Sequence, residues 1–137
     1  MPTPRDHEAL LALLERRARR PFAWGRNDCV RLAAAAVRAQ TGRRVLGGLT
    51  WRSRQAADAL LEQEGGVEAA VSKRLTPIAP ALAARGDIAG VPDDAFGIRL
   101  MIVEGTLLVG PGARGLVRMP RSAMTHAWSA DAIEDVN

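Results

Sequence analysis

The sequence contains no tyrosine, and phenylalanine and tryptophan together supply five of its 137 residues. Few large side chains can therefore anchor a core, and Ala, Leu and Val must fill most of it. Hydrophobic residues still make up 47% of the chain and charged residues 25%, which is typical of a folded globular protein. Because the length suits one ordinary domain and no repeat or linker divides the chain, we expect residues 1–137 to form a single domain.

Cysteine occurs once, as Cys29, and histidine twice, as His7 and His126. A single cysteine rules out an internal disulfide and cannot hold an iron–sulfur cluster. Together with two histidines it also falls short of a closed four-ligand zinc site. We therefore expect a protein with no metal and no cofactor.

The chain has no apolar run near the roughly 18 residues that a membrane span requires. Its first 20 residues also lack a positively charged segment followed by an apolar stretch, which is the pattern of a signal peptide. We therefore expect no membrane span and synthesis in the bacterial cytoplasm. Any action outside the cell would then need a carrier, and a virion is one such carrier.

Basic residues outnumber acidic ones by 19 to 15, and Lys73 is the only lysine. Such a surplus can indicate nucleic-acid binding. The one dense cluster, Glu15–Arg20, falls at the expected end of the first helix, where cations complement the helix dipole. No aromatic residues interleave with it, as a stacking platform for bases would require. A solvated helix end is the simpler interpretation, so nucleic acid is a disfavoured partner.

The N-terminal half carries helix signals: capping residues, apolar positions three and four apart, and glycine or proline stops. They predict four helices: a first from an N-cap at Thr3 to a stop at Pro21, a second from a cap at Asn27 or Asp28 to Gln40, a third over 53–63 and a short fourth over 67–74. Beyond Pro80, short β-rich runs separated by turns predict an antiparallel meander with strands at 87–91, 96–103, 106–110 and 116–119. Helices followed by strands indicate an α+β fold.

The segment Phe22–Cys29, with the sequence FAWGRNDC, places the cysteine in the first turn of the second expected helix. The helix dipole and the free backbone N–H groups favour a thiolate there, and the same N–H groups can hold an oxyanion. Acyl transfer by cysteine needs this arrangement together with a histidine from elsewhere in the fold. Alternatively, Cys29 is a small core residue on an Ala-rich helix, and position alone favours this second interpretation.

Three segments together carry a resemblance: the F-x-W-G-x-N-D-C motif, Arg85–Ala89 with the sequence RGDIA, and the terminal Ala127-Trp128. They resemble a family found beside phage and prophage tail genes, similar in layout to NlpC-type cell-wall peptidases. The resemblance covers nearly the whole chain, from about Leu10 to Trp128. It implies a papain-like, NlpC-like α+β fold with N-terminal helices packed on a C-terminal antiparallel sheet. It also implies Cys29 at the nucleophile position, and Gly86-Asp87 at the turn into the strand behind the site.

In active NlpC-type peptidases, a histidine opens the following strand in a His-Val-Gly-Ile-like segment. The best match in this chain is Ala95–Ile98, with the sequence AFGI, which puts Ala95 at the histidine position. The resemblance therefore implies a broken Cys–His dyad. His126 is the candidate replacement base, although a surface or packing role is the simpler interpretation. His7 is expected on an exposed helix turn, and Asp93-Asp94 in a turn between strands.

Three functions remain open from the sequence. The first is a structural or assembly component of a phage or prophage tail tip, bound to other tail-tip proteins, on a peptidase-like fold that has lost its dyad. The second is an active cysteine peptidase that cuts peptidoglycan peptides during DNA entry, with Cys29 as nucleophile and His126 as base. The third is a nucleic-acid-binding accessory protein, which rests on charge alone. The missing histidine favours the first, so we predict a virion component of the phage tail.

Overall fold

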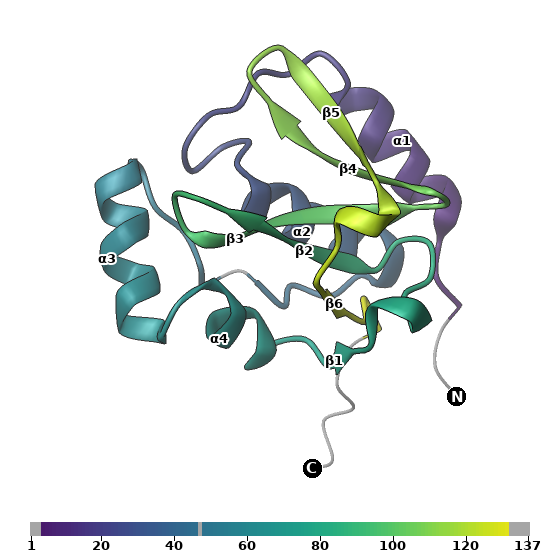
Figure 1. Cartoon of the computed structure of the whole chain (residues 1–137). Coiled ribbons are helices and arrows are strands. Elements are labelled where there is room, and N and C mark those ends of the chain that lie inside the picture. The colour runs from purple at the N-terminus through teal and green to yellow at the C-terminus, as the bar shows by residue number, and fades with distance from the viewer. Residues whose placement is uncertain (1–3, 47, 132–137) are drawn as a thin grey trace.

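The computed structural model describes residues 4–46 and 48–131 (Figure 1). In this part of the chain, four α-helices precede a six-stranded antiparallel sheet, so the predicted α+β class is confirmed. The helices are α1 (His7–Arg17), α2 (Cys29–Thr41), α3 (Arg54–Glu64) and α4 (Val67–Ser72). The strands are β1 (Pro77–Ile78), β2 (Ile88–Asp93), β3 (Gly97–Glu104), β4 (Leu107–Gly112), β5 (Gly115–Pro120) and β6 (His126–Trp128). Short 3-10 helices span Pro80–Leu82 and Arg121–Ala123.

The sheet has the strand order β1-β6-β2-β3-β4-β5. Strands β2 to β5 form the predicted meander, each pairing with the next along the chain. The last strand, β6, pairs with β2 on the side opposite β3, and β1 pairs with β6 at the edge of the sheet. Neither β1 nor β6 was part of the predicted meander. As a result, Gly90 of β2 lies between Leu100 of β3 and His126 of β6.

The two faces of the sheet bury different side chains, because successive residues of a strand point to opposite faces. One face carries Ile88, Leu100, Ile102 and Trp128 into the main core, which they share with the helices. Figure 1 shows α2 lying across this face. The opposite face contributes the smaller core, whose members are Ala83, Ala89, Val91, Met101, Val103, Leu108, Met124 and Ala127. The helix-covered face is therefore the one on which the start of α2 meets the sheet.

The helix α2 has the bounds that its local signals predicted. The side chain of Asp28 accepts a hydrogen bond from the backbone N–H of Arg31, and Gly42 ends the helix at a φ of 78°. Two of its six buried positions, Ala33 and Ala36, carry only a methyl group. Such small residues allow the helix backbone to approach the sheet closely, which sets the distance between the first turn of α2 and β3.

The first helix begins later than predicted. Thr3, the expected N-cap, lies outside the described residues, and Pro4 precedes the helix rather than opening it. Asp6 is the N-cap, since its carboxylate accepts a hydrogen bond from the N–H of Ala9 at 2.9 Å. Its own N–H donates to the carbonyl of Gln40. This bond fixes residues 4–6 as an extended arm across the end of α2, so the helix starts at His7.

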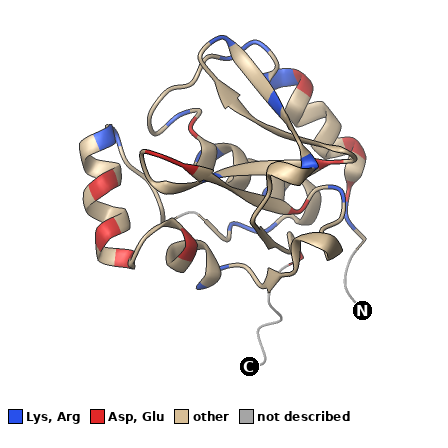
Figure 2. Ribbon diagram, in the orientation of Figure 1, with Lys and Arg blue, Asp and Glu red and all other residues tan. Residues whose placement is uncertain are grey.

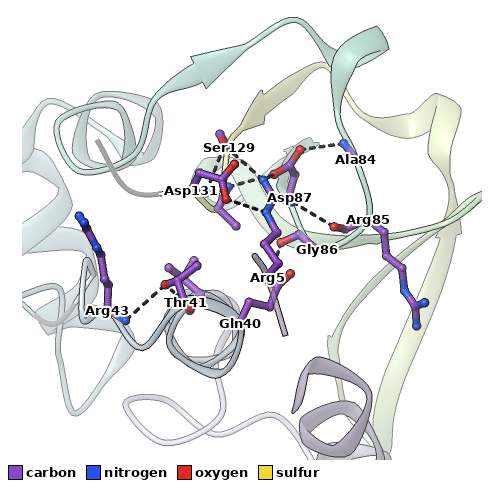
Figure 3. A network of polar contacts seen from close by, with 12 residues as sticks. Arg5, Gln40, Thr41, Arg43, Ala84, Arg85, Gly86, Asp87, Ser129 and Asp131 are labelled. Atoms are coloured by element: carbon purple, nitrogen blue, oxygen red, sulfur yellow. Dashed lines mark hydrogen bonds and ion pairs between the residues drawn. The ribbon is translucent and has the colours of Figure 1, made fainter. Parts of the chain in front are cut away.

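A polar network around the buried Asp87 fastens this arm to the rest of the chain (Figure 3). The guanidinium of Arg5 lies 2.6 Å from Oδ1 of Asp87 and 2.9 Å from Oδ1 of Asp131. Asp87 also accepts hydrogen bonds from the backbone N–H groups of Ala84 and Ala130. Burial disfavours the charged form of Arg5, but the two carboxylates outweigh this effect and raise its pKa above the usual value. The network ties the first, middle and last described segments together.

Charge is unevenly distributed over the surface (Figure 2). Acidic side chains are concentrated on α3, with Asp58, Glu62 and Glu64, whereas arginines occupy the end of α1 and the segment that follows it. None of the helices in residues 4–46 and 48–131 is long and apolar enough to cross a membrane.

Candidate functional site

A cavity of about 460 Å³ opens between β3 and the β4–β5 hairpin. Strand β4 pairs with β3 over Ile102–Glu104, and Figure 1 shows the hairpin rising away from β3 beyond that stretch. The segment that precedes α2 fills the base of the opening, where the N–H of Phe22 donates to the carbonyl of Gly112. The lining residues are Phe22, Trp24, Cys29, Arg54, Asp93, Ala95, Phe96, Arg99, Pro111, Gly112, Ala113 and Val117.

The segment before α2 is held in place by Asp28. Its Oδ2 accepts hydrogen bonds from the N–H of Gly25 at 2.8 Å and from the indole N–H of Trp51 at 2.9 Å. Gly25 has a φ of 77°, and a Cβ there would lie 2.0 Å from the carbonyl oxygen of Trp51, so only glycine fits this turn. Asn27 adds contacts to the end of α1, because its side chain binds Arg17 and the carbonyls of 20 and 21. The motif residues thus act as the frame of the cavity.

Cys29 is the first residue of α2, and its half-buried side chain lines the cavity. Burial is the main cause that raises the pKa of its thiol to about 11, because the thiolate is poorly solvated there. The backbone N–H of Leu100 and the charge of Arg99 oppose this rise, and the carboxylates of Asp28 and Asp93 add to it. The thiol is therefore protonated at neutral pH, which is the opposite of an activated nucleophile.

The apolar side of the cavity is built from aromatic rings. Trp24 contacts Phe22 edge-on, with ring centroids 4.8 Å apart, and Phe96 at 5.7 Å. The guanidinium of Arg54 lies over the ring of Phe96 at 5.9 Å, as in a cation–π contact. Trp24 thus packs the loop against the core and at the same time gives the cavity a flat apolar wall suited to apolar or peptide-like groups.

Three charged residues line the cavity although the sequence did not predict them there. Asp93 is the turn residue that was predicted, since its side chain accepts a hydrogen bond from the N–H of Phe96, but it also faces the cavity. Arg54 was assigned only to a helix start. Arg99 donates to the carbonyl of Pro111 across the opening. The sequence contains one sign of a charged site, because Arg99 is a single charge inside the apolar run of β3.

Ala95, which the resemblance to NlpC-type peptidases was expected to put at the histidine position, lines the same cavity as Cys29. It lies in the turn between β2 and β3, beside the thiol-bearing end of α2. Among the described residues, the cavity lining includes no histidine. The described lining of this cavity therefore offers Cys29 no imidazole as a general base.

His126 belongs to a different pocket, of about 150 Å³, which it lines with residues of α4 and β1. Its Nδ1 lies 2.9 Å from the hydroxyl of Thr125, its Nε2 lies 3.4 Å from a carboxylate oxygen of Glu68, and its ring stacks on Trp128. Two strand spacings, on the order of 10 Å, separate the backbones of His126 and Leu100. The structure does not bring the two candidate catalytic residues together.

The Gly86-Asp87 motif lies at the far end of α2 from Cys29. The carbonyl of Gly86 accepts a hydrogen bond from the side chain of Gln40, near the C-terminus of the helix (Figure 3). A helix of 13 residues is about 20 Å long, so this motif positions the sheet on α2 rather than contacting the thiol. Within residues 4–46 and 48–131, no group of three or more His, Cys, Asp or Glu side chains could hold a metal ion.

The fold and the cavity define an α+β protein with one protonated thiol at the start of a helix, in a cleft with an aromatic wall. The family model described as a domain of unknown function, DUF6950, matches residues 2–130, so the chain belongs to the DUF6950 family. No curated protein matches the sequence.

Proposed function

We propose that the protein is a structural or assembly component of a phage or prophage tail tip, built on an NlpC-like, papain-like fold whose catalytic dyad is degenerate. The observation that carries the loss of catalysis is that Cys29 and Ala95 line one cavity with no histidine among the described lining residues. The raised pKa of the thiol agrees with it. The assignment to a tail rests on the resemblance carried by the Phe22–Cys29 motif and on the helix-then-sheet order of the fold.

The motif residues support a structural role because each has a partner within the fold. Asp28 caps α2 and binds both Gly25 and Trp51, while Asn27 joins the loop to α1. In this proposal the motif maintains a shaped cavity that receives a neighbouring tail protein. The cavity's mixture of aromatic rings and Arg54 suits a peptide segment better than a purely polar ligand.

The tail role can be tested in a phage or prophage that encodes the chain. We expect mass spectrometry of purified particles to detect the protein, and deletion of its gene to abolish infective particles. Particles carrying Cys29→Ser are expected to reach the wild-type titre, because a structural component needs no nucleophile. Absence of the protein from the particles would contradict the tail assignment. Loss of infectivity by Cys29→Ser, with the protein still incorporated, would contradict the loss of catalysis.

Restoration of the missing histidine tests whether the fold is peptidase-like. We expect Ala95→His to bring the pKa of the Cys29 thiol below the usual value of about 8.5, because a nearby imidazolium stabilises the thiolate. The rate of iodoacetamide alkylation at pH 7 should then rise at least about tenfold. Asp94→His, which adds the same side chain one exposed residue away, is the matched control. Equal rates for both variants would show that position 95 is not a base position.

The active-peptidase alternative keeps one supporting observation, the place of Cys29 at the N-terminus of α2 beside the N–H of Leu100. It requires His126 to leave Glu68 and Thr125 and to approach the cavity. If this alternative holds, the protein hydrolyses peptidoglycan peptides and His126→Ala abolishes that activity. Our proposal predicts no hydrolysis by the wild-type protein.

A further inference from the structure

A second cavity, of about 400 Å³, lies on the solvent-facing side of α2 and is lined almost entirely by arginines. Among the residues that the structure describes, none of those lining it is acidic. The lining residues are Arg17, Arg26, Arg31, Ala34, Ala35, Arg38 and Arg44. Five arginines in one cavity differ from an ordinary solvated surface, where charges of both signs are mixed.

The arginines converge because of their spacing on α2 and the small residues between them. Arg31 and Arg38 are seven residues apart and flank Ala34-Ala35, so all four lie along one stripe of the helix. The two methyl groups leave a shallow floor. Arg17 reaches this floor from the end of α1 and Arg26 from the loop before α2, while Arg44 comes from the segment that follows the helix.

The positive charge of this cavity is not neutralised within the described part of the chain. The ion pairs found there involve Arg5, Lys73, Arg74 and His126, and none of the five cavity arginines. Arg17 donates to the neutral amide of Asn27, and Arg31 donates to the carbonyls of 46 and 49. The Nε of Arg31 is buried without a hydrogen-bond partner. Burial, together with the neighbouring Arg20 and Arg16, lowers the pKa of Arg17.

These features define the charge and size of a ligand. Guanidinium groups pair with phosphate oxygens through two parallel hydrogen bonds, and five of them call for a ligand with several negative charges. Within residues 4–46 and 48–131, the cavity lining includes no aromatic side chain on which a base could stack. Its arginines gather in one hollow rather than along a track, which suits a compact anion better than a nucleic-acid duplex. We propose that this arginine pocket binds the phosphate chain of a small polyphosphorylated molecule.

The test measures binding of sodium tripolyphosphate to the full chain by calorimetry and thermal shift, in magnesium-free buffer. We expect saturable binding and a higher melting temperature than with sodium sulfate at equal ionic strength. The double variant Arg38→Ser/Arg44→Ser, which removes two exposed arginines of the pocket, should weaken binding at least about tenfold. Arg114→Ser/Arg118→Ser removes the same charge from the exposed β4–β5 hairpin and should leave the affinity unchanged.

Further ligands separate the possible sources of the phosphate chain. Equal affinity for ATP and tripolyphosphate would support recognition of the phosphate chain alone, and at least about tenfold tighter binding of ATP would support a nucleotide as its source. The proposal is overturned if tripolyphosphate acts no more strongly than sulfate, or if the two double variants weaken binding equally. It is also overturned if a hexaglutamate peptide or a 12-base-pair duplex binds the pocket more tightly than tripolyphosphate, because the partner would then be a protein or DNA.

Discussion

Replacement of Asp28 by alanine is expected to lower the free energy of unfolding by about 3 to 5 kcal/mol, through the loss of the cap and of two further bonds. The carboxylate is almost completely buried and accepts three hydrogen bonds, from the N–H groups of Arg31 and Gly25 and from the indole of Trp51. An N-cap alone contributes about 1 kcal/mol. The larger value follows because the part-buried N–H of Gly25 and the buried indole N–H of Trp51 would also lose their partner.

Urea denaturation followed by circular dichroism measures this effect, since a shift in the midpoint at constant slope reports stability. Ser53→Ala is the matched control. Ser53 caps α3 through a single bond to the N–H of Ala56 on an exposed helix, so its loss should cost about 1 kcal/mol. If Asp28→Ala destabilises the protein no more than Ser53→Ala does, then Asp28 is a simple cap and does not frame the cavity.

Replacement of Asp87 by alanine is expected to lower the free energy of unfolding by about 3 to 4 kcal/mol, because it leaves buried donors without an acceptor. Asp87 is 2% exposed and binds Arg5 as well as the N–H groups of Ala84 and Ala130. Its removal would break the bonds that join the start of β2 to Arg5 of the N-terminal arm and to Ala130 after β6 (Figure 3). Arg5 would keep its own bond to Asp131.

Asp131→Ala provides the comparison for Asp87→Ala. Asp131 binds the same guanidinium of Arg5, but its side chain is 55% exposed. An exposed ion pair contributes about 0 to 1 kcal/mol, so this variant should remain close to the wild type in the same urea titration. Similar losses for the two variants would show that the ion pair, rather than the buried acceptor, holds the arm.

Much of the fold could be predicted because its signals are local. The cap at Asp28 and the stop at Gly42 define α2, while Ser53 and Gly65 define α3. The short strands β1 and β6 were not part of the predicted meander, because two or three residues are too few to show an alternating pattern. Their pairing is decided by tertiary contacts, as is the start of α1, where Asp6, bound to Gln40, caps the helix in place of the predicted Thr3.

The candidate site likewise contains residues that the sequence could predict and residues that it could not. Cys29 follows from the motif, and Ala95 follows from the resemblance to NlpC-type peptidases. Arg54, Asp93 and Arg99 could not be assigned, because they come from three elements and meet at the cavity through the divergence of β3 from the β4–β5 hairpin. The arginine pocket could not be predicted either. The sequence shows a cluster of arginines at the end of α1, but not that arginines of α1, α2 and the adjoining loops meet in one cavity.

The central claim, that Cys29 is not an activated nucleophile, is tested most directly by the pH dependence of its alkylation by iodoacetamide. The chain has a single cysteine, so the signal has one source. Because burial raises the pKa of the thiol to about 11, the native protein should react slowly at pH 7, and its rate should rise through an inflection well above pH 9. An inflection below the free-thiol value of about 8.5 would show instead that Cys29 is an activated thiolate.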